Sequence, residues 1–191
     1  MREMPPERRN FGYTMLELVM VISVVAILAT IAMPGFKYVT TSNRIASEVN
    51  GLLGDMQFAR SEAVKEGQTV TVCIAANANL NSCAGAAAGG NWALGWIVFL
   101  DTNGDQQVQA ATEAIIRKQP AFSGTDTFVA GSAAFNSVTF NRLGYAPTGV
   151  TTVISLHDST ANPNWTRCLA VNPIGSTVTE KAGVGTPVAC N

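Results

Sequence analysis

The feature that most constrains this chain is a run of aliphatic residues close to its N-terminus. From Tyr13 to Met33 the only charged side chain is Glu17, and residues 18–33 are almost wholly aliphatic. A helix over this run would be about 31 Å long, which is enough to cross the hydrocarbon core of a bilayer. The run therefore predicts a membrane-spanning helix.

A short polar segment, residues 1–12, precedes this run. Its charged residues are Arg2, Glu3, Glu7, Arg8 and Arg9. Because basic flanking residues favour the cytoplasmic side of a membrane, we expect this segment in the cytoplasm and the rest of the chain outside it. A secretory signal peptide is the alternative. However, the aliphatic run is longer than the usual apolar region, and Pro34-Gly35 follows it in place of a small-residue cleavage site.

Helical periodicity continues beyond the aliphatic run. Apolar residues recur at spacings near three and four, at Ile45, Val49, Leu52, Leu53, Met56 and Ala63. Such a stripe is typical of a helix that packs one face against a domain. Gly67 follows, where a left-handed cap would end a helix. The pattern predicts one helix from about Thr14 to Glu66, which Pro34 should kink or locally melt.

After Gln68 the sequence changes to short β-rich runs between turn residues. The runs that predict strands are 69–74, 92–100, 114–119, 137–140, 150–156, 167–171 and 176–179. Residues 75–90 form a low-complexity loop, which we expect to be mobile and tied down only by Cys83. The fold class is therefore α+β, a long helix packed on a mostly antiparallel sheet, with a single sheet as the simplest assembly.

Four cysteines, Cys73, Cys83, Cys168 and Cys190, all follow the predicted membrane segment. An even number in an exported domain indicates disulfides, for which three pairings are possible. We favour pairing of nearest neighbours, Cys73 with Cys83 and Cys168 with Cys190, because it closes two loops rich in small and polar residues. Structural zinc is disfavoured because the chain has no C-x-x-C pair and its one histidine is His157.

A calcium site is the one metal hypothesis that the sequence raises. Asp101, Asn103 and Asp105 alternate as in the opening of an EF-hand loop. The match is incomplete, because Gln106 replaces the expected glycine and Thr112 the expected glutamate. We therefore expect no metal and interpret Asn103-Gly104 as a hairpin turn, with calcium at Asp101, Asn103 and Asp105 as the alternative.

The sequence offers no convergent catalytic residues. His157, Asp158 and Ser159 have the residue types of a catalytic triad, but consecutive residues in an extended chain point in alternate directions. A turn at a strand end explains them better. The aromatic residues Trp92, Trp96, Phe99 and Trp165 fit core packing better than a stacking surface. We expect no enzymatic activity and no cofactor.

The residues at the start of the aliphatic run form a specific motif. The stretch Gly12-Tyr13-Thr14-Met15-Leu16-Glu17-Leu18 resembles the class III signal of type IV pilins and type II secretion pseudopilins, with Tyr13 and Met15 in place of the usual Phe and Leu. The resemblance implies that a prepilin peptidase cuts between Gly12 and Tyr13 and methylates the new amino group of Tyr13. It also implies that Glu17 attracts the positive N-terminus of a neighbouring subunit during assembly, and that Pro34 occupies the proline position of the family.

Further stretches, at 43–44, 52–66, 95–105 and 113–117, resemble minor pilins and pseudopilins of the GspH/FimT family. The implied domains are a leader (1–12), a transmembrane half-helix (13–34), an amphipathic half-helix (35–67) and a periplasmic β-rich domain (68–191). The implied function is that of a structural subunit that helps initiate, cap or modulate a type IV pilus or a type II secretion pseudopilus. It would start in the bacterial inner membrane and end in a periplasmic or extracellular filament.

The resemblance also implies partners. These are the prepilin peptidase, other pilins or pseudopilins, the inner-membrane assembly platform and membrane lipid. DNA is the alternative partner, because some FimT-like minor pilins bind it through a Gly-Arg-x-Arg motif. The corresponding stretch here, Gly175-Ser176-Thr177-Val178, lacks both arginines, and residues 68–191 carry five basic against six acidic residues. Nucleic acid is therefore disfavoured, with Arg117-Lys118 as the remaining local patch.

Overall fold

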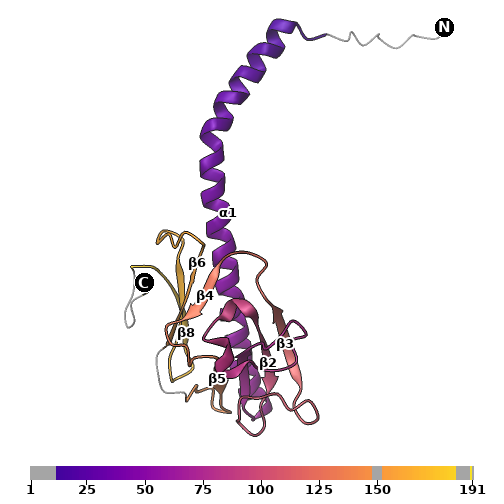
Figure 1. The fold of residues 1–191 in the computed structure, drawn as a ribbon, viewed down its shortest axis with the longest axis vertical. Helices are drawn as coiled ribbons and strands as arrows, with labels where there is room; N and C mark the ends of the chain where they lie inside the picture. Colours follow the sequence, from indigo (N-terminus) through magenta and orange to yellow (C-terminus); the bar gives the residue numbers. More distant parts are fainter. Residues whose placement is uncertain (1–11, 148–151, 184–189, 191) are drawn as a thin grey trace, which may run out of the picture. The chain divides into compact units, whose positions relative to one another are not determined.

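The computed structural model describes residues 12–147, 152–183 and 190. The backbone divides into two compact units, Met1–Thr40 and Thr41–Asn191. One helix, α1 (Met15–Glu66), begins in the first unit and ends in the second. Figure 1 shows it in indigo and violet, with the strands following in sequence colours. The predicted helix from about Thr14 to Glu66 is confirmed to within one residue.

Local side-chain and backbone chemistry accounts for both ends of α1. The hydroxyl of Thr14 accepts a hydrogen bond of 3.2 Å from the backbone N–H of Glu17, which caps the first turn. Gly67 follows the last residue with φ of 66°, a left-handed conformation that ends the helix. The backbone stays helical through Pro34, so of the two effects predicted there, a kink or local melting, local melting is excluded and the kink stays a prediction.

The first sheet contains strands from the beginning and the middle of the second unit. Its members are β1 (Val70–Ile74), β2 (Gly95–Leu100), β3 (Ile115–Pro120) and β5 (Ser137–Phe140). Their order is β3-β2-β1-β5, and all three pairings are antiparallel. Two short 3₁₀ helices, Gly85–Ala88 and Trp92–Leu94, lie between β1 and β2.

A second sheet corrects the expectation of a single one. Its members are β4 (Thr127–Ala130), β6 (Thr152–His157), β7 (Arg167–Val171) and β8 (Thr177–Lys181). Their order is β4-β6-β7-β8, again antiparallel. Strand β4 was not predicted from the sequence. Without β4 as the partner of β6, the later strands could not be separated from the first sheet.

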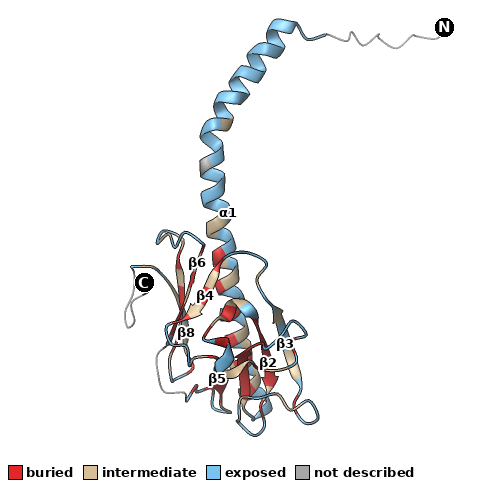
Figure 2. Ribbon diagram, in the orientation of Figure 1, coloured by how far each residue is buried: buried red, intermediate tan, exposed pale blue. Residues whose placement is uncertain are grey.

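The core of the second unit forms where both sheets meet the apolar face of α1. The buried helix residues are Ile45, Val49, Leu52, Met56, Ala59 and Ala63. Residues from both sheets, such as Val72 and Leu169, belong to the same buried cluster. In Figure 2 the red segments of α1 lie among the red strands. The amphipathic stripe predicted from spacing is therefore the helix's packing face.

The aromatic residues behave as the sequence predicted. Trp92 and Trp96 are fully buried in the main core, and Trp165 is partly buried against it. Phe99 is fully buried in a smaller cluster on the first sheet. Trp96 packs edge-on against Phe122 and Phe128, with ring centroids 5.9 and 6.4 Å away. Core packing therefore accounts for these rings.

The segment 75–90 is better fixed than its composition suggested. Besides the link through Cys83, the N–H of Ala84 donates to the carbonyl of Ile74, and the N–H of Gly90 donates to the side chain of Asn136. Leu80 and Ala88 are buried. The prediction that Cys83 alone ties down this loop was wrong, because backbone groups supply fixed points that composition does not reveal.

Candidate functional site

The predicted cleavage bond lies immediately before α1. Gly12 and Tyr13 are both exposed, and the Tyr13 side chain is 84% accessible. The helix begins two residues later, at Met15. The bond therefore lies in accessible backbone outside regular secondary structure, as a protease substrate requires.

Glu17 stands alone in an apolar surface. It lies in the first turn of α1, where the helix dipole favours a negative charge. Its neighbours Leu16, Leu18 and Met20 are all exposed. Among the residues that the structure describes, no ion pair involves Glu17. Its carboxylate is thus available to a group outside the chain.

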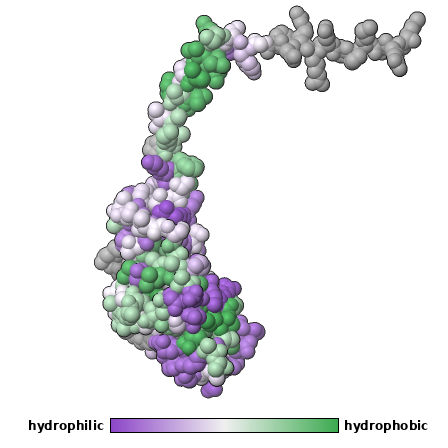
Figure 3. Space-filling model, turned by 45° about the vertical axis from the view of Figure 1, so that its right-hand side comes forward, coloured by the Kyte–Doolittle hydropathy of each residue, from purple (hydrophilic) through white to green (hydrophobic). Residues whose placement is uncertain are grey.

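The N-terminal part of α1 has the length and composition of a membrane span. A window of this helix has a mean hydropathy of 2.5, and none of that window is buried within the protein. Its apolar side chains form the green surface of the helix in Figure 3. Exposed apolar surface of this extent is unfavourable in water and calls for lipid or protein contact.

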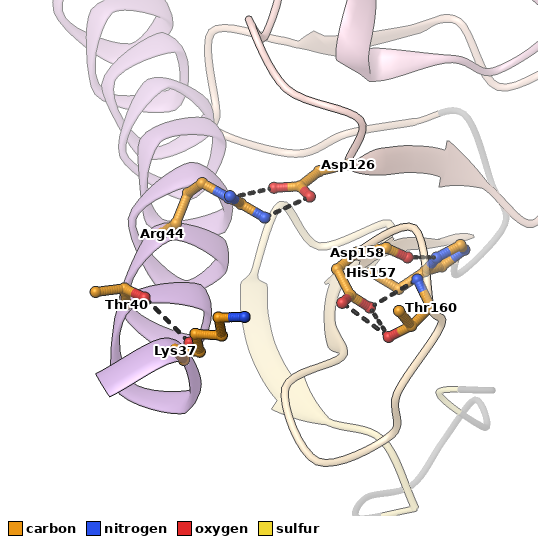
Figure 4. Close-up of polar contacts among 7 residues, drawn as sticks. All are labelled: Lys37, Thr40, Arg44, Asp126, His157, Asp158 and Thr160. Carbon is orange, nitrogen blue, oxygen red and sulfur yellow. Dashed lines mark hydrogen bonds and ion pairs between the residues drawn. The ribbon is translucent and has the colours of Figure 1, made fainter. Parts of the chain in front are cut away.

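A buried ion pair joins α1 to the loop before β4. Arg44 donates two hydrogen bonds, of 2.6 and 2.7 Å, to the two carboxylate oxygens of Asp126 (Figure 4). The Asp126 side chain is fully buried, whereas that of Arg44 is half exposed. This bidentate contact fixes the loop to the helix. Sequence reasoning missed this ion pair, because Asp126 lies in an irregular segment 82 positions from Arg44.

Glu48 lies close to the same ion pair and carries an unfavourable charge. Burial raises the pKa of Glu48 to about 7, the negative charge of Asp126 adds to the rise, and Arg44 partly offsets it. One Glu48 carboxylate oxygen is buried without a hydrogen-bond partner. A proton on Glu48 would allow it to donate to Asp126. This group therefore titrates near neutral pH.

A second polar cluster joins α1 to the first sheet. Asp55 accepts hydrogen bonds from the indole N–H of Trp96, at 2.8 Å, and from Arg117, at 2.7 Å. The Arg117 guanidinium also lies 3.8 Å from the centre of the Phe58 ring. Arg117 is thus engaged within the domain. This weakens Arg117-Lys118 as a nucleic-acid patch, because the charge of Arg117 is neutralised by Asp55, and of the two residues only Lys118 forms no ion pair among the described residues.

The candidate calcium residues lie in a loop whose carboxylates accept hydrogen bonds from groups of the same loop. Asp101 is buried, and its carboxylate accepts hydrogen bonds from the N–H groups of Gly104 and Gln106 and from the Thr71 hydroxyl. A hydrogen bond from the Gln107 backbone is the main cause that lowers the pKa of Asp105. Among the described residues, no group of three or more His, Cys, Asp or Glu side chains is placed to hold a metal.

The connection from β2 to β3 also differs from the expected hairpin turn. It runs from residue 101 to 114, and the N–H groups of Thr102 and Gln109 donate to the carboxylate of Glu113. Asn103-Gly104 lies within this longer loop and does not join the strands directly. The loop is held in place by hydrogen bonds to the buried Asp101 carboxylate and not by a tight turn.

His157 and Asp158 form a turn at the end of β6, as predicted. The His157 Nδ1 atom lies 2.9 Å from the Asp158 carbonyl oxygen, not from its carboxylate. The carboxylate instead accepts hydrogen bonds from Thr160 (Figure 4). Burial alone would raise the pKa of Asp158, but hydrogen bonds from Trp165, Thr160 and Asn162 lower it. These contacts have a structural role.

Two disulfides complete the domain. Cys73 in β1 is bonded to Cys83, and Cys168 in β7 is bonded to Cys190. This is the nearest-neighbour pairing favoured from the sequence. Each bond ties a loop or terminal segment to a strand in the middle of a sheet.

Comparison with known proteins agrees with this architecture. The family model described as type II transport protein GspH matches residues 48–175. Two crystal structures of the type IV minor pilin FimU from Pseudomonas aeruginosa match with TM-scores of 0.58 and 0.54 at 21% identity. The matches cover 78% of this chain and 96% and 99% of the FimU chains. No curated protein sequence matches the chain significantly.

Proposed function

Because the chain belongs to the family of type II transport protein GspH, we propose that it is a minor pilin or pseudopilin that helps initiate, cap or modulate a filament. The filament is a type IV pilus or a type II secretion pseudopilus. The observation that carries this proposal is α1 itself, whose N-terminal part is apolar and exposed and whose C-terminal part forms the core of a β-rich domain. The FimU match supports the fold on which the proposal rests.

The N-terminal segment would first act as a leader and an anchor. A prepilin peptidase removes residues 1–12 and methylates the amino group of Tyr13, and the apolar half of α1 holds the subunit in the inner membrane. The domain then lies in the periplasm. Its two disulfides support this location, because disulfides persist in oxidising compartments.

Assembly would follow from the charge of Glu17. An isolated carboxylate in hydrocarbon has a high free energy, so pairing with a cation stabilises the subunit. The amino group of Tyr13 on a neighbouring subunit supplies that cation, and the pairing neutralises both charges and sets the axial register. The inner-membrane assembly platform brings the two subunits together.

Pro34 would give α1 a point of adjustment. Proline lacks the N–H that a helix donates to the fourth preceding residue, so the carbonyl of Thr30 loses its usual donor. A helix bends or opens more easily at such a position. The apolar half could then follow its neighbours in the filament without disturbing the domain.

Processing and incorporation test this proposal in order. The full chain is produced beside a prepilin peptidase, and its intact mass should correspond to a chain that begins at N-methylated Tyr13. The Glu17→Ala variant should be processed normally but be lost from sheared filaments. Ser23→Ala, on the same exposed helix, is the matched control and should enter filaments. Wild-type incorporation of Glu17→Ala would refute the charge-pairing mechanism, and an unprocessed chain would refute the pilin assignment.

A further inference from the structure

Exposed apolar side chains of the second unit gather in three segments that meet. Among its described residues, the exposed large apolar side chains are Val64, Leu94, Leu143, Tyr145, Ile174 and Val178. Leu94 lies in the 3₁₀ helix before β2, and Val178 pairs with Ala170 on the face of β8 opposite the core. The other four belong to the end of α1, the turn at 141–145 and the turn at 172–176. Such clustering is typical of a contact surface.

Close contacts hold these three segments together. A Cβ atom on Gly175 would lie 2.0 Å from the Gly144 carbonyl oxygen and 3.2 Å from the Arg60 Nε atom. Gly175 has φ of 77°, so glycine is required there for two reasons. The N–H of Ala146 also donates to the carbonyl of Pro173 at 3.0 Å. The arrangement is therefore built into the backbone.

A groove lies between the helix and the second turn. Its volume is about 530 Å³, and the lining residues are Gln57, Arg60, Ser61, Val64, Gly175, Ser176 and Thr177. We call it the Arg60 groove. Val64 lies on its helical wall, and the exposed Ile174 adjoins its other wall. The groove thus combines an apolar border with small polar groups on its floor.

Arg60 gives the groove a positive charge that pairs with no carboxylate among the described residues. It is the one charged residue in the lining. Its guanidinium donates to the carbonyl of Ile174 at 3.4 Å, and no ion pair within the described part of the chain involves it. By contrast, Arg44 and Arg117 are both held by buried or partly buried carboxylates. A carboxylate of another molecule could therefore form an ion pair with the Arg60 guanidinium.

Among the described residues, no strand pairs with the outer edge of β8, the strand beside the groove. Thr177 is the first residue of β8 and lines the groove, and β8 is the outermost strand of its sheet. An edge strand offers unpaired backbone groups to an added strand. A partner segment that matched the five residues of β8 would extend for about 17 Å.

We propose that the Arg60 groove binds an extended acidic segment of a neighbouring filament subunit, which pairs with the edge of β8 and places a carboxylate against Arg60. The identity of the partner as a filament subunit rests on the proposed function. The apolar residues Val64, Leu143 and Ile174 contact apolar side chains on either side of that carboxylate. Nucleic acid fits less well, because a single arginine among aliphatic side chains neutralises few phosphates.

The test uses the purified full chain in detergent and an array of short overlapping peptides that covers the other pilin subunits of the same organism. Binding should select peptides with acidic and apolar residues. Arg60→Glu and Ile174→Asp, on opposite walls, should each weaken binding by about tenfold or more, as expected for central contacts. Lys118→Glu and Leu94→Asp, at exposed positions outside the groove and β8, are the matched controls and should bind as the wild type does. Circular dichroism and disulfide content verify folding of each variant.

Each other outcome would overturn the proposal. Selection of basic peptides, equal losses in groove and control variants, or no selective binding at all would refute it. Groove-dependent binding of single-stranded DNA in place of peptides would assign the groove to another class of partner. In cells, normal incorporation of Arg60→Glu beside loss of Glu17→Ala would refute the groove while preserving the proposed function. Absence of even the wild type from filaments would refute the proposed function, whereas peptide binding would still be measurable.

Discussion

Replacement of Glu48 by glutamine should make the domain more stable at neutral and alkaline pH. The ordinary pKa of this carboxyl is 4.5, and burial raises it to about 7 in the folded chain. A carboxyl whose folded pKa is raised favours the folded state fully below pH 4.5. That contribution is lost as pH rises through about 7. Above pH 7 Glu48 is ionised in both states, and its negative charge is less stable in the folded chain than in the unfolded chain, where water surrounds it.

The magnitude follows from the same pKa difference. In full, the difference between 4.5 and about 7 would correspond to about 3 kcal/mol. Because Glu48 is only partly buried, solvent screening reduces the expected effect to about 1–2 kcal/mol. Glu48→Gln should therefore raise the free energy of unfolding by about this amount at pH 8 and leave it nearly unchanged at pH 4. The amide can also donate to Asp126, as a protonated Glu48 would.

Urea unfolding of the full chain in detergent, with disulfides intact and tryptophan fluorescence as the signal, measures this effect between pH 4 and pH 8. Glu62→Gln is the control on the same helix, where the side chain pairs with Lys65 at the surface. The control should not gain stability as pH rises. If the difference between wild type and Glu48→Gln were the same at both ends of the pH range, or had the opposite sign, the reasoning would be wrong.

Four further variants probe the contacts that hold the domain. Arg44→Ala should destabilise it by about 3 kcal/mol in urea unfolding, because the buried Asp126 loses its cation; Asp126→Asn should cost less, since the half-exposed Arg44 can turn to water. Asp101→Ala should cost about 2–3 kcal/mol in thermal unfolding, because two N–H groups and a hydroxyl lose their acceptor, and a negligible change would contradict its organising role. Replacing Cys168 and Cys190 by serine should cost about 2–4 kcal/mol, and non-reducing peptide mapping of the wild type should detect this pair.

Strong periodic signals made the helix and most strands predictable. The stripe from Ile45 to Ala63 repeats at helical spacing over several turns, and Gly67 ends it. The β-rich runs were recognisable because apolar and β-branched residues stand between turn residues. Five of those runs match observed strands within two residues at each end. The run at 150–156 matches β6 at its end, and its first two residues lie outside the described residues. The run at 92–100 begins with a 3₁₀ helix before β2.

Pairing and polar contacts were not predictable in the same way. Nothing local in the sequence indicates that β6 pairs with β4, or that Asp126 meets Arg44, because both depend on segments far apart in the chain. For Asp101, a local pattern in the sequence suggested an interaction that the structure does not contain among its described residues. Its spacing with Asn103 and Asp105 suggested a cation, but the loop's own N–H groups satisfy the carboxylate. A sequence motif shows which polar groups are present, but it does not show which of them form hydrogen bonds within the chain.

The sharing of one helix face by both sheets has a consequence for when the domain can fold. Ile45, Leu52 and Met56 pack in a cluster that also contains Leu169 and Val171, near the other end of the chain. Contacts of such long separation form slowly, because the intervening chain must be ordered first. The stripe on α1 is therefore fully covered only when nearly the whole domain has been synthesised. During that interval a nascent chain exposes part of the apolar surface that chaperones bind, and in the proposed role the membrane anchor would limit how far the chain diffuses toward another unfinished chain.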